Sequence, residues 1–103
     1  MIPSIEEHRS QLTELCLRHH VLRLSLFGSA TRDDFDPQRS DLDFLVDFEP
    51  LLPGEHADAY FGLLEGLESL FGRPIDLVES STLRNPYRRQ EIEATQVLLH
   101  AAA

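Results

Sequence analysis

Two aspartates separated by a single residue, Asp41 and Asp43, are the side chains of this sequence best suited to chemistry. Apolar and polar residues alternate from 41 to 48, which is the period of a half-buried β-strand. Residues i and i+2 of a strand have Cα atoms roughly 7 Å apart and point the same way, so both carboxylates can converge on a hard cation. Such oxygen ligands favour Mg²⁺, and two ions roughly 3.5–4 Å apart can clamp the attacking and leaving oxygens of a transfer at phosphorus.

A third acid, Asp76, lies in the segment 74–79, where Ile75 and Leu77 alternate with Asp76 and Val78 as in another strand. If this strand lies beside the segment 41–48, the Asp76 carboxylate reaches the same edge of the sheet as the aspartate pair. The sequence therefore predicts a magnesium site that contains three carboxylates.

A phosphate-binding turn is predicted at Gly28-Ser29, where the apolar strand segment 21–27 ends. Glycine permits close backbone approach, and exposed amides together with the Ser29 hydroxyl can hold a phosphate. Arg32 follows three residues later and can add positive charge to the same anion. The chain contains no lysine, which excludes the Walker A loop and leaves metal ions, backbone amides and arginine to hold a triphosphate.

The elements that must position these residues follow from periodicity and capping signals. Ser4-Ile5-Glu6-Glu7 resembles a capping box and predicts a first helix to about His20. The segment 21–27 reads as a strand with Leu22, Leu24 and Leu26 on one side, and the segment 30–40 reads as a loop. The second strand, 41–48, is followed by a linker from Glu49 through Gly54.

Two further helices are predicted in the second half of the chain. Apolar residues between 60 and 71 recur at helical spacing, and Gly72 caps that helix. Asn85-Pro86 is the preferred start of a helix, and we expect the last one to place four residues on its apolar side and to end in a frayed segment, 101–103. These four residues are Ile92, Val97, Leu98 and Leu99.

The predicted fold class is α/β, in the α+β sense: a small mixed β-sheet of about three strands flanked by helices. Only about 14 residues join the first two strands, which favours an antiparallel pair, whereas the helical crossover between the second and third favours a parallel pair. The length of 103 residues and the absence of repeats predict a single domain over residues 1–103.

The composition limits the classes of partner. A formal net charge of −9 makes nucleic acid an unlikely ligand, because affinity for polynucleotides comes largely from lysine and arginine. No apolar run approaches the roughly 20 residues that span a bilayer, and no signal peptide is recognisable, so we expect no membrane and a cytoplasmic location. The single cysteine, Cys16, lies among leucines and is interpreted as a reduced core thiol.

Other polar clusters have simpler interpretations. His19, His20 and His56 lack a further ligand at zinc spacing, so a structural or surface role is expected. Arg84, Arg88 and Arg89 form the one dense basic cluster of the sequence. It is interpreted as a solvated helix face, with docking of an acidic partner or RNA as the alternative.

Leu26-Phe27-Gly28-Ser29, followed after eleven residues by the segment 40–46 (SDLDFLV), closely resembles the signature of the polymerase-β-like nucleotidyltransferase superfamily. The chain length, Arg32, the segment 73–78 (RPIDLV) and Asn85-Pro86 resemble the minimal nucleotidyltransferase (MNT) branch, so the likeness covers nearly the whole chain. It implies a nucleotidyltransferase fold. One departure is Asp33, which stands where the family often has glycine and brings negative charge near the expected triphosphate.

The resemblance also implies roles for individual residues. Gly28 and Ser29 would bind phosphate together with Arg32. Asp41 and Asp43 would bind the metal, and Asp76 would be the third acid that can activate the acceptor hydroxyl.

The function implied is transfer of AMP from ATP, with Mg²⁺, to a tyrosine hydroxyl of a HEPN-domain ribonuclease toxin, for which the protein would act as antitoxin. Two alternatives stay open. The protein can neutralise the toxin by binding alone, as its acidic surface would suit a basic cleft. Transfer to a small molecule such as an antibiotic is the weakest hypothesis, because such enzymes generally use a second domain to shape the acceptor pocket.

Overall fold

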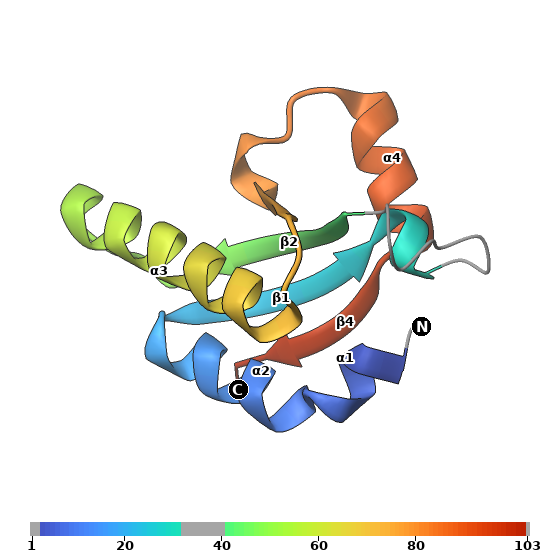
Figure 1. The fold of residues 1–103 in the computed structure, drawn as a ribbon. Coiled ribbons are helices and arrows are strands. Elements are labelled where there is room, and N and C mark those ends of the chain that lie inside the picture. The colour runs from blue at the N-terminus through green and yellow to red at the C-terminus, as the bar shows by residue number, and fades with distance from the viewer. Residues whose placement is uncertain (1–2, 32–40, 103) are drawn as a thin grey trace.

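The computed structural model describes residues 3–31 and 41–102 (Figure 1). None of the helices in these ranges is long and apolar enough to cross a bilayer. In chain order the elements are α1 (Pro3–Glu7), α2 (Arg9–Arg18), β1 (Val21–Phe27), the 3₁₀ turn η1 (Gly28–Thr31), β2 (Leu42–Phe48), α3 (Pro53–Phe71), β3 (Ile75–Glu79), the 3₁₀ turn η2 (Ser80–Thr82), α4 (Pro86–Thr95) and β4 (Val97–Ala101).

The strands form one mixed sheet in the order β3-β2-β1-β4. β1 is antiparallel to both β2 and β4, whereas β2 and β3 run parallel and are joined by the crossover helix α3. The predicted α+β class, the mixed sheet and the orientations of the first three strands are therefore confirmed. The predicted number of strands is corrected from three to four.

The fourth strand lies where the sequence predicts the end of the last helix. Helix α4 ends at Thr95, Gln96 is extended with φ −65° and ψ 142°, and Val97–Ala101 pair with β1. Val97, Leu98 and Leu99 therefore do not share a helical face with Ile92, and Ala101 belongs to a strand. The backbone groups of this segment are satisfied by β1, a long-range partner that a periodicity argument cannot detect.

Two other predictions are corrected at the N-terminal side. The first helix is divided into α1 and α2, ends at Arg18, and contains Ser4 instead of beginning after it. A register shift between Val21 and Arg23 turns Leu22 outward, so that its side chain is 37% exposed while Leu24 is fully buried. The bulge breaks the strict alternation that placed Leu22 beside Leu24.

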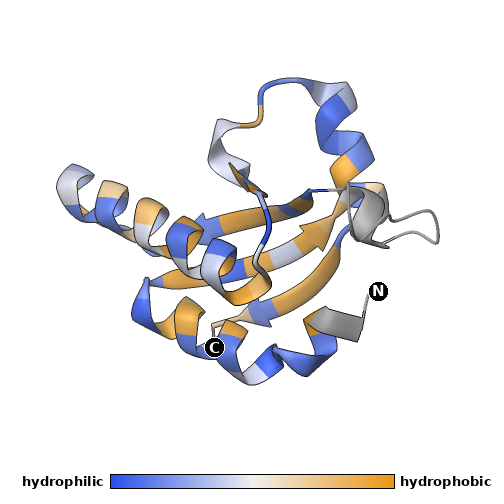
Figure 2. Ribbon diagram, in the orientation of Figure 1, coloured by the Kyte–Doolittle hydropathy of each residue, from blue (hydrophilic) through white to orange (hydrophobic). Residues whose placement is uncertain are grey.

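The main core lies between one face of the sheet and helices α2 and α3. Figure 2 shows apolar residues along the strands and on the sides of these helices that approach them. Helix α3 ends as predicted at Gly72, which adopts the left-handed conformation with φ +62°. The largest fully buried side chains of this core include Leu12, Cys16, Leu24, Leu26, Leu42, Phe44, Leu63 and Leu67.

The opposite face of the sheet is covered in part by α4. Asn85 caps this helix through its side-chain oxygen, which accepts from the amides of Tyr87 at 2.9 Å and Arg88 at 3.4 Å, so the predicted cap is confirmed. Ile92 of α4 is 1% exposed but does not belong to the main core cluster. Asp43, Leu45 and Asp47 are only partly buried and alternate with buried residues on β2, so they point toward the α4 side.

Candidate active site

The structure brings two of the three predicted acids together. Asp43 on β2 and Asp76 on β3 are register partners across the parallel pair, so they lie side by side on the sheet. Asp43 is half-buried and Asp76 is exposed. Asp41 immediately precedes β2 and is exposed, and the next amide, that of Leu42, donates to the carbonyl of Pro74 at 3.3 Å.

Gly28 lies directly against this acid pair. Its preceding residue, Phe27, is the register partner of Asp43, and a Cβ atom at Gly28 would lie 2.5 Å from Oδ2 of Asp43. Gly28 also has φ +74°, a conformation that side-chain-bearing residues rarely adopt. Its amide donates to Thr95 Oγ1 at 3.2 Å, and its carbonyl accepts from Thr31 Oγ1 at 2.7 Å. The positive φ favours glycine at this position, and any side chain here would also displace the Asp43 carboxylate.

The other predicted phosphate ligands are only partly placed. The backbone of Ser29 lies in η1, directly after Gly28 at the end of β1. Arg32 and Asp33 lie outside the described residues, as does the remainder of the segment 32–40.

A cleft of about 360 Å³ opens above the acid pair, and we call it the acid cleft. Sequence reasoning did not assign the three α4 residues in its wall. Their spacing of i, i+3 and i+4 after the Asn85 cap is the signal that could have indicated a shared face. The residues that line the cleft are Phe27, Gly28, Asp43, Asp76, Arg88, Glu91 and Ile92.

Arg88 interacts with the acid pair itself. Its Nη2 atom lies 3.6 Å from Oδ2 of Asp76, and both side chains are about half exposed. The sequence interpretation of Arg88 as a solvated or docking residue is therefore incomplete, because α4 brings its guanidinium to the acid cleft. A cation there can offset repulsion between Asp43 and Asp76 or contact an anionic ligand.

The donor set suits a magnesium ion bound together with a nucleotide. Within residues 3–31 and 41–102, no group of three or more histidine, cysteine, aspartate or glutamate residues gathers to hold a metal ion. Mg²⁺ usually takes one or two protein carboxylates and completes its shell with substrate phosphates and water. The pair of Asp43 and Asp76, kept open by the absence of a side chain at Gly28, fits that pattern.

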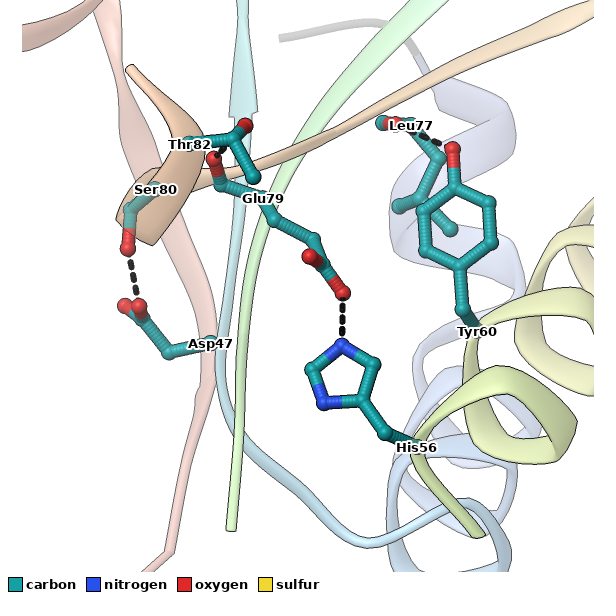
Figure 3. A network of polar contacts seen from close by, with 7 residues as sticks. All are labelled: Asp47, His56, Tyr60, Leu77, Glu79, Ser80 and Thr82. Carbon is teal, nitrogen blue, oxygen red and sulfur yellow. Dashed lines mark hydrogen bonds and ion pairs between the residues drawn. The ribbon is translucent and has the colours of Figure 1, made fainter. Parts of the chain in front are cut away.

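A polar network supports the strand that carries Asp76. His56 of α3 and Glu79 at the end of β3 approach to 2.5 Å, and Tyr60 donates its hydroxyl to the carbonyl of Leu77 at 2.7 Å (Figure 3). Burial, and then the charges of Glu79 and Asp76, raise the pKa of Tyr60, so its hydroxyl remains a donor at neutral pH. Both contacts tie α3 to the edge strand β3, and they give His56 a structural partner.

The other histidine and cysteine residues lie away from the acid cleft. The ring of His19 packs against Gly62 of α3, where an added Cβ would meet its Cε1 atom at 2.6 Å. Burial, and then the charges of Arg18 and His20, lower the pKa of His19. Cys16 is fully buried in the main core, and this burial raises its pKa to about 12. The interpretation of Cys16 as a buried thiol agrees with its position.

A mixed sheet with a carboxylate pair beside a glycine turn is the arrangement expected from the resemblance to nucleotidyltransferases. Residues 7–98 match the family model described as a nucleotidyltransferase domain, and the chain belongs to this family. This membership identifies the protein as a nucleotidyltransferase.

Named relatives support the same assignment. The chain is 37% identical to the protein adenylyltransferase MntA of Thermococcus cleftensis, over 80% of this chain and 83% of the relative. It is 32% identical to a provisionally assigned protein adenylyltransferase of Methanocaldococcus jannaschii, over 86% of this chain and 84% of the relative.

Solved structures show the same fold. One provisionally assigned minimal nucleotidyltransferase superposes with a TM-score of 0.72 at 32% identity, covering 89% of both chains. A chain from the complex of a tri-AMPylated HEPN toxin of Shewanella oneidensis with an MNT antitoxin superposes with a TM-score of 0.65, covering 95% of this chain and 73% of that one. At 18% identity, this second likeness concerns the fold alone.

Proposed function

We propose that the protein transfers AMP from ATP to a hydroxyl group of a partner protein, in a reaction that depends on Mg²⁺. The observation that carries this proposal is the in-register pair of Asp43 and Asp76 beside Gly28, where a Cβ atom would reach the Asp43 carboxylate.

In this mechanism each residue has a limited task. Asp43 and Asp76, with Asp41 just before β2, would hold Mg²⁺, and the chemistry that the ion would supply is neutralisation of phosphate charge and orientation of the nucleotide. The Gly28 amide donates to Thr95 Oγ1, so this residue would serve by letting the phosphates approach the backbone closely, whereas Ser29 would bind them and Arg32 would add a positive charge. Asp76 accepts the proton of the attacking hydroxyl, whose oxygen displaces pyrophosphate from the α-phosphorus. Most of the rate enhancement would come from positioning and electrostatics.

We further propose that the acceptor is a tyrosine of a HEPN-domain ribonuclease toxin, for which the protein acts as antitoxin. The support is the relative MntA, a protein adenylyltransferase that shares 37% of its aligned residues with this chain. The AMPylated toxin in complex with an MNT antitoxin gives a precedent on the same fold for this kind of acceptor.

The test uses purified protein, α-labelled ATP, Mg²⁺ and the HEPN protein encoded beside its gene, where one is present. We expect label on the toxin, lost by more than about a hundredfold in Asp41→Asn/Asp43→Asn and on chelation of the metal. Asp58→Asn on α3 is the matched control and should keep full activity, since it lies outside the acid cleft. Absence of label with the unsubstituted protein would overturn the proposal.

A second candidate function is neutralisation by binding alone, which the net charge of −9 favours. Growth rescue by Asp41→Asn/Asp43→Asn in cells that express the toxin separates the two functions. Rescue equal to that of the unsubstituted protein would support simple binding, whereas loss of rescue with an intact complex would support enzymatic neutralisation.

A further inference from the structure

A second cleft adjoins the acid cleft on the same face of the sheet. It encloses about 160 Å³ between the sheet and the segment from η2 to the end of α4. We call it the inner cleft and define it by its principal polar residues, Arg23, Ser25, Asp47, Arg89, Glu93 and Gln96. Nothing in the mechanism above uses these side chains.

The two clefts are neighbours along β2. Asp43 lines the acid cleft and Asp47 lines the inner cleft, four residues further along the same strand, which corresponds to about 13 Å. Ile92 of α4 contributes to the walls of both. The clefts thus meet at Ile92, and an elongated ligand that passes this side chain would reach from Asp43 to the space beneath α4.

The clefts differ in charge. The described wall of the acid cleft carries Asp43, Asp76 and Glu91 against one arginine, which suits a metal ion with its phosphates. The inner cleft carries Arg23 and Arg89 against Asp47 and Glu93, so its formal charges cancel. Together with hydroxyl and amide groups, these residues offer both hydrogen-bond donors and acceptors. This combination suits an uncharged polar ligand that itself has donors and acceptors.

Several groups of the inner cleft are held in place. Ser80 donates to the carboxylate of Asp47 and so joins η2 to β2 (Figure 3). Arg89 donates from Nη2 to the carbonyl of Leu83 at 2.9 Å. Ser25 lies in the middle of β1 and is 4% exposed.

We propose that the inner cleft binds the nucleoside part of the donor nucleotide, its base and ribose, while the triphosphate lies in the acid cleft. Asp76 is half exposed on the edge strand β3, which leaves the open side of the acid cleft to a macromolecular acceptor. The more enclosed inner cleft is then available to the smaller substrate, the donor nucleotide. This inference rests on the proposed nucleotidyl transfer and adds the residues that recognise the base.

The test compares Glu93→Ala/Gln96→Ala with Gln90→Ala, because Gln90 is an exposed residue of α4 outside both clefts. Steady-state transfer to the acceptor is measured with ATP, GTP, CTP and UTP. Calorimetry measures binding of ATP and of inorganic tripolyphosphate, each with Mg²⁺. We expect the double variant to raise KM for ATP about tenfold, to reduce discrimination among the bases, and to bind tripolyphosphate as the unsubstituted protein does.

An unchanged KM and base preference in the double variant would overturn the inference, and so would a tripolyphosphate affinity that falls as much as the ATP affinity. If the unsubstituted protein transfers no nucleotide but binds ATP with a base preference that the variant loses, the inner cleft is supported and the proposed transfer is not. If the unsubstituted protein transfers nucleotide and the double variant keeps its base preference, the proposed transfer is supported and the role of the inner cleft is not. Thermal unfolding of each variant confirms that the fold is retained.

Discussion

Gly28 combines two constraints that occur separately at other glycines of the chain. It has a positive φ of +74° and no room for a Cβ beside Asp43. Gly72 has a similar φ of +62°, but a Cβ there would meet no atom within 4 Å. Gly54 near the start of α3 also has open space and has no unusual φ. Gly28 therefore has both constraints, Gly72 has the unusual φ alone, and Gly54 has neither. Substitutions at these three positions can distinguish the effect of backbone strain from that of contact with the Asp43 carboxylate.

We predict that Gly28→Ala lowers the free energy of unfolding by about 1–3 kcal/mol and abolishes transfer, because the new methyl group displaces the Asp43 carboxylate. Gly72→Ala should cost about 1 kcal/mol without affecting activity. Gly54→Ala should be neutral or stabilising by up to about 1 kcal/mol. Urea unfolding and labelled-ATP transfer measure both effects, and a fully active Gly28→Ala variant would contradict the proposed site.

At the residue scale, spacing predicts the glycine turn and the meeting of Asp43 with Asp76, but the predicted cluster of three carboxylates is not formed within the described residues, and the wall opposite the acids is not predicted. Asp43 follows from strand alternation, and Asp76 follows once the parallel crossover places β3 beside β2. Arg88 and Glu91 were missed as cleft residues because the direction in which α4 docks depends on long-range packing of Ile92 and not on local pattern.

At the scale of elements, α4 contributes residues to the walls of both clefts. Its N-terminal end is capped by the side chain of Asn85. The Asn85 side chain satisfies the amides of Tyr87 and Arg88, which would otherwise lack helical partners. The side-chain oxygen of Asn85 thus helps to fix the first turn of α4, which holds Arg88 beside Asp76.

We predict that Asn85→Ala lowers the free energy of unfolding by about 1 kcal/mol and reduces transfer several-fold, because fraying of the first turn loosens Arg88. Asn85→Asp should preserve both properties, since aspartate caps helices about as well as asparagine. Chemical denaturation and the transfer assay provide the measurements. Equal activity of the alanine and aspartate variants would mean that the cap does not position the cleft.

The strands and helices were predictable to the extent that their signals are local. The strand 21–27, the glycine cap of α3 and the asparagine cap of α4 were all legible in the sequence. The strand β4 was not, because Val97–Leu99 also fit the apolar face of a helix and only pairing with β1 decides between the two. The bulge at Leu22 likewise reflects pairing with β2, not the residue itself.

At the scale of the whole molecule, stability and activity depend on opposite faces of one sheet. Leu24, Leu26 and Phe44 point into the main core beneath α2 and α3, whereas Ser25 and Asp43 line the clefts on the α4 side. Alternation along β1 and β2 therefore assigns neighbouring residues to different tasks. Substitutions on the core side should act on stability first, and those on the cleft side on activity first.

Cys16 offers a probe of global unfolding, since it is fully buried in the core and is the only cysteine. Its pKa of about 12, against an ordinary 9.0, lowers the thiolate fraction at neutral pH by about a thousandfold. We predict that the native protein reacts very slowly with iodoacetamide and that the rate rises in parallel with the unfolded fraction. Rapid labelling of the folded protein, at the rate of a free thiol, would contradict this burial.

The in-register placement of Asp43 and Asp76 has a mechanical consequence. β3 is the outermost strand beside β2, and it borders the sheet on one side only. An ion bound by both carboxylates would add a link between β3 and β2 and so hold the edge strand against its neighbour. Local opening of β3 would then require release of the ligand, so the amides of residues 75–79 should exchange with deuterium more slowly when magnesium and nucleotide are bound. Occupancy of the site can thus be followed through backbone protection, without observing any turnover.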